Sequence, residues 1–277
     1  LNSSPIFHLG LLDQGWWPDG LLTAATDEAL RFDIEATLEM GFNTIRKHVK
    51  VEPARWYWHA DRLGVLVWQD MPSTVFNMVE FGKQLKEGTK PEEMEWESIS
   101  PGKDPEGFRS ELDAMLHALQ LFPSIVVWVP FNEAWGQHDT NGTLTHVMRS
   151  DPTRLVDGPS GWTDMGLGHM RDHHLYQDAE QLPEAESGRA TVYGEFGGIS
   201  LYIDGHSMFE KGWGYTKTES VEDFLTSYEE LLAAIGSLIP EGLAGAIYTQ
   251  TTDVESEING LLTYDRKYKL QPEKVRL

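Results

Sequence analysis

The stretch Ser124-Ile-Val-Val-Trp-Val-Pro-Phe-Asn-Glu133 indicates the fold of this chain. Its apolar part, 125–129, has no alternating polar residue, and such runs are typical of parallel strands covered on both faces. The run ends at Asn132 and Glu133. A carboxylate at the end of a buried strand is costly to desolvate, which indicates a functional position. Because a (β/α)8 barrel places its chemistry at these strand ends, the stretch favours that α/β fold.

A second stretch, Ala190-Thr-Val-Tyr-Gly-Glu195-Phe-Gly-Gly198, has the same design. It is a short apolar strand that ends in Glu195, and the glycines after it allow a loop or a ligand to approach closely. Two glutamates at strand ends are the residue types that a glycosidase needs. Six other segments predict the remaining strands of the barrel: 6–12, 43–48, 65–70, 154–157, 170–176 and 243–250.

Helices are predicted between several of these strands, beginning at Asp27, Glu52, Pro105 and Val221. Thr26 precedes the first of them as a capping residue, and Gly41 suits the left-handed position at its end. The segment 71–104 predicts a long irregular loop, a kind of segment that is usually functional or mobile. The chain shows no second hydrophobic unit, so we expect one domain over residues 1–277.

Composition excludes several functions. The chain has 277 residues, a net charge of −22 and no cysteine. Such an acidic chain is not expected to bind nucleic acid or an anionic membrane, because both require basic patches. Disulfides and thiolate chemistry are excluded. No apolar run reaches the length of a membrane span, so we expect a soluble protein, either cytoplasmic or secreted, and the oligomeric state stays open.

Six ordered blocks of the sequence together resemble the catalytic barrel of family 2 glycoside hydrolases: 13–20, 41–48, 63–70, 132–135, 194–198 and 248–255. The family includes β-galactosidases, β-glucuronidases and β-mannosidases. The resemblance implies a retaining exo-β-glycosidase in which Glu195 is the nucleophile and Glu133 the acid/base. A β-galactoside is the substrate we expect. The alternatives are a β-glucuronidase, a β-mannosidase, or a carbohydrate-binding barrel without turnover.

The resemblance also implies sugar-binding residues. Asn132 is expected to bind the sugar 2-hydroxyl, and Tyr176 to hydrogen-bond the nucleophile. The other residues expected at the sugar site are Asp13, Arg46, His48, Asp70, Trp135, His174 and Tyr248. For Arg46, His48 and Asp70 a purely structural ion network is an equal alternative, and Trp135 is either a stacking platform or a core residue.

A zinc site at His173 and His174 is not expected, because adjacent residues on a strand point to opposite faces. No cofactor is predicted; relatives in the family sometimes bind Mg²⁺ or Na⁺ near the site, but no carboxylate cluster supports an assignment. The family usually carries β-sandwich domains before the barrel, and none is expected within 1–277. The charge of Glu195 should favour a proton on Glu133, so the two are expected to titrate as a coupled pair.

Overall fold

The computed structural model describes residues 4–72, 80, 83–84, 86, 88, 104–177 and 179–276. The loop predicted at 71–104 lies almost entirely outside these residues. Eight parallel strands form one sheet with the order β5-β4-β3-β2-β1-β10-β7-β6. The strands are β1 (His8–Asp13), β2 (Thr44–Lys47), β3 (Leu66–Asp70), β4 (Ile125–Val129), β5 (Leu155–Val156), β6 (Met170–Leu175), β7 (Ala190–Gly197) and β10 (Leu243–Thr249).

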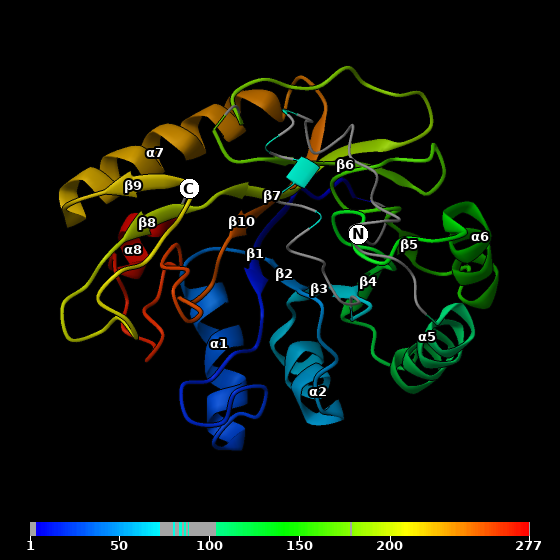
Figure 1. Cartoon of the computed structure of the whole chain (residues 1–277), viewed down its shortest axis with the longest axis horizontal. Helices are drawn as coiled ribbons and strands as arrows, with labels where there is room; N and C mark the ends of the chain where they lie inside the picture. Colours follow the sequence, from blue (N-terminus) through cyan, green and yellow to red (C-terminus); the bar gives the residue numbers. More distant parts are fainter. Residues whose placement is uncertain are drawn as a thin grey trace.

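The sheet curves round so that its two edge strands, β5 and β6, approach each other (Figure 1). A single parallel bridge between Asp157 and Met170 joins the two edges, because β5 itself has only two residues. All eight predicted strands are present. The prediction of a (β/α)8 barrel is therefore confirmed.

Helices surround the sheet in Figure 1. They are α1 (Asp27–Glu39), α2 (Ala54–Leu63), α5 (Pro105–Leu119), α6 (Thr140–Ser150), α7 (Val221–Leu238) and the short α8 (Pro272–Val275). The Thr26 hydroxyl accepts a hydrogen bond from the Ala29 N–H at 3.1 Å, as expected for a helix cap. Gly41 has φ of 89° just beyond the end of α1, a conformation that costs glycine nothing.

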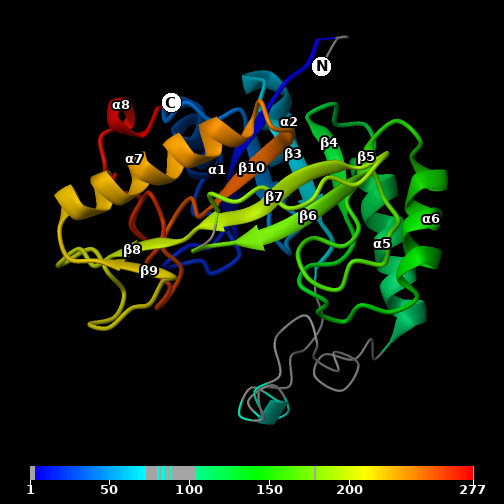
Figure 2. The same ribbon diagram turned by 90° about the horizontal axis from the view of Figure 1, so that it is seen from above.

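Helices α6 and α8 and strands β8 (Ile199–Leu201) and β9 (Thr216–Thr218) were not predicted. Helix α6 contains threonine, asparagine and glycine, which are weak helix formers, and it is stabilised by the burial of Leu144 and Val147. The segment after Glu195, which was expected to be a loop, contains a small parallel sheet of β8 and β9. Figure 2 shows this small sheet on the same side of the barrel as α7.

The core has an inner part and an outer part. The barrel interior contains Leu12, Trp68, Val127, Val129, Met170, Val192 and Ile247. Two larger clusters fill the space between the sheet and the helices. Among the described residues, no helix has the length and the apolar character needed to cross a lipid bilayer.

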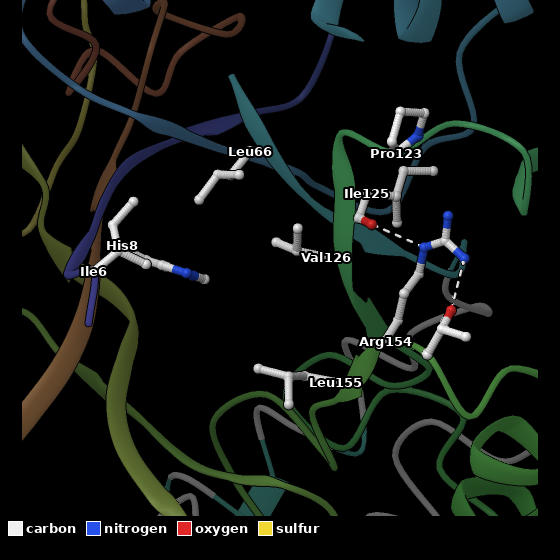
Figure 3. Close-up of a pocket in the computed structure, with 9 residues that line it drawn as sticks. Ile6, His8, Leu66, Pro123, Ile125, Val126, Arg154 and Leu155 are labelled. Atoms are coloured by element: carbon white, nitrogen blue, oxygen red, sulfur yellow. Dashed lines mark hydrogen bonds between the residues drawn. The ribbon is translucent and has the colours of Figure 1, made fainter. Parts of the chain in front are cut away.

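A cavity of about 510 Å³ lies at the N-terminal ends of the strands (Figure 3). Its lining residues are Ile6, His8, Leu66, Pro123, Ile125, Val126, Thr153, Arg154 and Leu155. Arg154 closes one side, where its Nε donates to the Ile125 carbonyl at 2.8 Å. In barrels of this kind the N-terminal face serves stability. The chemistry is therefore expected at the opposite end of the strands.

Candidate active site

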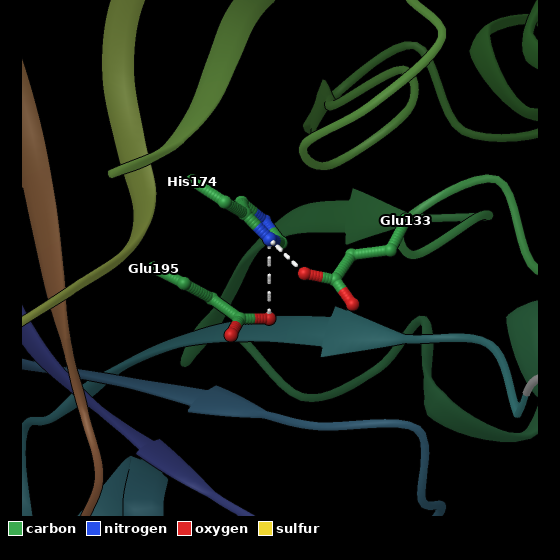
Figure 4. Close-up of side chains that lie close together, drawn as sticks. All are labelled: Glu133, His174 and Glu195. Atoms are coloured by element: carbon green, nitrogen blue, oxygen red, sulfur yellow. Dashed lines mark hydrogen bonds and ion pairs between the residues drawn. The ribbon is translucent and has the colours of Figure 1, made fainter. Parts of the chain in front are cut away.

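Glu133 and Glu195 meet at the C-terminal end of the barrel. Glu133 follows β4, and Glu195 lies within β7. One carboxylate oxygen of each, together with one ring nitrogen of His174, lie within 4.8 Å of one another. Figure 4 shows both carboxylates facing the same imidazole ring. Glu133 has a positive φ of 49°, a conformation that is uncommon for residues other than glycine and that is often found at functional sites.

His174 connects the two carboxylates. Its Nδ1 lies 2.7 Å from Glu133 Oε1 and 3.6 Å from Glu195 Oε1. Burial alone would lower the pKa of His174, but the negative charge of Glu195 and the hydrogen bond to Glu133 outweigh it and raise the pKa to about 9. His174 is therefore a cation at neutral pH. The sequence predicted two carboxylates that repel each other, whereas the structure places a positive charge between them.

The second ring nitrogen of His174 forms a hydrogen bond with Ser160. Nε2 lies 2.8 Å from the Ser160 hydroxyl, which also donates to Asp172 at 2.5 Å. A protonated imidazole has no lone pair to offer a metal ion. Glu133, His174 and Glu195 are close enough together to hold a metal, and with His174 protonated they form an ion-paired cluster. His173 does not join this cluster, as the alternation of side chains predicted.

Arg46 is the centre of the charge network beneath Glu195. It is fully buried, and a guanidinium has five N–H groups. Two of them donate to Asp70 at 3.0 and 2.9 Å. The others reach the Gly194 carbonyl at 3.1 Å, Glu195 Oε1 at 3.3 Å and Asn132 Oδ1 at 2.7 Å. Every donor of Arg46 therefore has an acceptor within the protein.

The carboxylate of Glu195 is held in the ionised form. Burial raises its pKa, but the positive charges of His174 and Arg46 outweigh burial and hold the pKa below the usual range. Its second oxygen, Oε2, accepts a hydrogen bond from the Tyr176 hydroxyl at 2.5 Å. Tyr215 stacks on Tyr176 with 3.4 Å between ring centroids. Glu195 is thus a charged group whose two oxygens both have fixed partners.

Three residues beside Arg46 differ in how many side-chain atoms remain able to contact a ligand: Asn132, His48 and Asp70. Asn132 gives Oδ1 to Arg46, while its Nδ2 has no hydrogen-bond partner among the described residues. His48 Nδ1 forms a hydrogen bond with Asp70 Oδ2 at 3.1 Å. The His48 side chain is 14% exposed. Asp70 is fully buried and forms hydrogen bonds with both Arg46 and His48. Asp70 is thus occupied by protein donors, whereas Asn132 and His48 keep atoms that can face a ligand.

Two predicted residues are not brought into this cluster. Asp13 is buried and gives its oxygens to the Gly15 N–H at 2.7 Å and to Lys47 Nζ at 2.6 Å. Tyr248 lies in the outer core, where its ring contacts Phe196 and Tyr228. Its neighbour along the strand, Ile247, faces the barrel interior, so Tyr248 points away from it. Tyr248 is completely buried there, and its expected contact with a sugar stays a prediction.

Trp135 lies in the tight turn that follows Glu133, where its N–H donates to the Asn132 carbonyl at 2.9 Å. It is partly buried, so the prediction of a stacking platform stays a prediction. Sequence reasoning missed Ser160 and Tyr215. Ser160 lies in a glycine-rich segment, and Tyr215 follows an exposed Trp213 in a loop. Neither position carries a periodic signal that would have identified it.

Stability should depend on pH through His174. Its folded pKa of about 9 lies above the ordinary value of 6.5, so its protonated form stabilises the folded protein fully below about pH 6.5. This contribution is lost as the pH rises through 9. Between pH 6.5 and pH 9, we expect the free energy of unfolding of the wild type to fall. The fall should be up to about 3 kcal/mol larger than that of the His174→Gln variant. Urea denaturation at several pH values measures it, and parallel curves for the two proteins would contradict the expected charge on His174.

Comparison with known proteins gives one sequence family and many similar structures. Residues 23–188 match the family model "Glycosyl hydrolases family 2, TIM barrel domain". No curated protein matches the chain. A β-galacturonidase of Eisenbergiella tayi bound to galacturonate has 18% identity and a TM-score of 0.70, over 96% of this chain and 50% of that one. A β-glucuronidase of Ruminococcus gnavus has 14% identity and a TM-score of 0.71, over 99% and 50%.

The β-glucuronidase 2 of Bacteroides uniformis has 18% identity and a TM-score of 0.69, over 96% of this chain and 34% of that one. The chain therefore spans about half the length of these proteins or less. At such low identity the structural likeness concerns the fold, and the sugar named for each protein is a property of that protein.

Proposed function

The chain belongs to glycosyl hydrolases family 2, and we propose that it removes terminal β-linked sugars by a retaining double displacement, with Glu195 as nucleophile and Glu133 as acid/base. One observation carries the mechanism. An oxygen of each carboxylate lies within 4.8 Å of the other. Retaining enzymes place the two carboxyl groups roughly 5–5.5 Å apart, whereas inverting enzymes need roughly 6.5–9.5 Å to admit a water molecule.

The roles follow from the surroundings of each carboxylate. Glu195 is ionised and held on both oxygens by Arg46 and Tyr176, which suits a group that must attack the anomeric carbon from a fixed position. Glu133 has one oxygen on His174, and Figure 4 shows its other oxygen turned away from the ring. That second oxygen can give a proton to the departing glycosidic oxygen.

His174 also suits the second step. Once the sugar is attached, Glu195 is an ester and has lost its negative charge. His174 still holds Glu133 in place through the contact of its Nδ1 with Glu133 Oε1 at 2.7 Å. As the base of this step, Glu133 accepts a proton from the water that cleaves the ester, and the nucleophile is restored. Asn132 Nδ2 would donate to the sugar 2-hydroxyl, a contact that strengthens in the transition state.

We propose a neutral sugar, with a β-galactoside as first candidate. A uronate would need a cation with free donors, and Arg46 has none left. Lys47 is occupied as well, because its Nζ binds Asp13 at 2.6 Å and Glu52 at 3.0 Å. Within the residues that the structure describes, the strand ends around Glu195 thus offer no unpaired lysine or arginine to a carboxylate.

A panel of nitrophenyl glycosides tests the proposal. The purified protein should hydrolyse the β-galactoside faster than the β-glucoside, β-mannoside, β-glucuronide and β-galacturonide. Proton NMR of the first product should show the β-anomer, because two displacements restore the configuration. An α-anomer would overturn the retaining mechanism. Binding of sugars without hydrolysis of any glycoside would favour a carbohydrate-binding barrel.

A further inference from the structure

Glu257 is a carboxylate that the mechanism does not use. It lies in the loop after β10 and is partly buried. Several buried acids in the molecule have a cation: Lys269 binds Asp253 at 2.7 Å, and Arg46 binds Asp70 at 2.9 Å. In the described part of the chain, no lysine, arginine or histidine forms an ion pair with Glu257. A partly buried carboxylate without a cation is costly, which indicates a binding role.

A relay of buried amides fixes the position of this carboxylate. Gln14 Nε2 donates to Gln250 Oε1 at 2.9 Å, and Gln250 Nε2 donates to Asn259 Oδ1 at 2.9 Å. Asn259 Nδ2 then donates to Glu257 Oε1 at 3.0 Å. Gln250 and Asn259 are completely buried. Gln14 follows β1 and Gln250 follows β10, so the relay lies at the same end of the barrel as Glu195.

A wall of aromatic residues connects Glu257 to the nucleophile from the other side. The backbone of Trp213 pairs with that of Glu257, and the Trp213 and Tyr215 rings lie 5.7 Å apart. Tyr215 in turn stacks on Tyr176, whose hydroxyl binds Glu195. Burial raises the pKa of Glu257, and the negative charge of Glu195 raises it further. The contacts through Trp213, Tyr215 and Tyr176 thus connect Glu257 to the residue that holds Glu195.

We propose that Glu257 is a specificity-determining residue, which accepts a hydrogen bond from a hydroxyl of a neutral terminal sugar and excludes sugars that carry a carboxylate. The inference rests on the proposed glycosidase function and names the substrate class of that site. A hydroxyl can donate to Glu257, whereas a uronate would bring a second negative charge against it. The amide relay holds the carboxylate in place, so it cannot turn away from such a sugar without breaking its hydrogen bonds.

The test compares nitrophenyl β-galactoside with nitrophenyl β-galacturonide, which differ only in a hydroxymethyl or a carboxylate at C6. Glu257→Gln keeps the shape of the side chain and removes its charge. We expect kcat/KM to fall about 10-fold or more for the galactoside and to rise for the galacturonide, so that their ratio changes by about 100-fold. Glu255→Gln is the matched control, because Glu255 lies exposed in the same loop. For this variant, the ratio of kcat/KM for the galactoside to kcat/KM for the galacturonide should equal that of the wild type.

A Glu257→Gln protein with the wild-type ratio would overturn the inference and leave the glycosidase function intact. A wild-type protein that prefers the galacturonide would also overturn it. If the wild type hydrolyses neither compound nor any other glycoside, the proposed function fails. Calorimetric titration with galactose and galacturonic acid then decides the inference separately, since Glu257→Gln should still shift binding toward galacturonic acid, and equal shifts in the two affinities would refute it.

Discussion

Glu195→Gln is expected to reduce kcat/KM about 10⁴-fold or more on every glycoside. An amide is a poor nucleophile and cannot form the glycosyl ester that the double displacement requires. Arg46 can still donate to the glutamine oxygen, and the glutamine NH2 group can donate to the Tyr176 hydroxyl, so the loss should be chemical and not a loss of folding. Thermal unfolding of the variant should accordingly show a single cooperative transition, as in the wild type.

An activated substrate makes this test sharper. A dinitrophenyl glycoside needs no proton on its leaving group, yet it should be as inert as the nitrophenyl glycosides toward Glu195→Gln. A 2-fluoro glycoside should add the mass of one sugar to the wild type and none to the variant. Glu229→Gln, an exposed change on α7, is the matched control and should keep full activity. Trapping of the sugar on another residue would contradict the role of Glu195.

Glu133→Ala is expected to have an effect that depends on the leaving group. Loss of a general acid typically costs about 10²–10⁴-fold, so glycosides with poor leaving groups should lose activity in that range. The first step on a dinitrophenyl glycoside should survive, because its leaving group departs without a proton. The glycosyl-enzyme should then accumulate, because no base activates water for the second step.

Azide should restore turnover of the Glu133→Ala variant, because it attacks the glycosyl-enzyme without help from a base. The product should be the β-glycosyl azide, identified by NMR. The space left by the side chain lies beside His174, whose positive charge favours entry of an anion. Azide should do nothing for Glu195→Gln. Formation of the β-glycosyl azide by Glu195→Gln instead would mean that the two roles are exchanged, because retention requires a glycosyl-enzyme.

The sequence by itself determined the barrel and its two principal carboxylates. Strand burial is a local property, and the unbroken apolar run at 125–129 predicted β4 without knowledge of its neighbours. Glu133 and Glu195 stood out for a related reason. Removing a carboxylate from water next to a buried strand costs free energy wherever the strand packs, so the position of the carboxylate already indicates a functional role.

Position at a strand end was not sufficient to predict where the side chains of Tyr248 and Asp13 lie. Which face a strand residue occupies depends on the pairing of that strand, and β10 pairs with β7 through register shifts on either side of Ala246. Tyr248 therefore lies in the outer core. Asp13 faces Lys47 on the adjacent strand, and this pairing follows from the register of β1 with β2.

Only the tertiary structure decided how the carboxylates are charged and surrounded. Arg46 comes from β2 and reaches Glu195 on β7, and His174 on β6 enters between Glu133 and Glu195. Glu257 and its amide relay come from loops after β1 and β10, which are far apart in the sequence. These contacts join strands that are brought together by closure of the barrel. Their distances depend on the tilt and stagger of the strands, which no local pattern encodes.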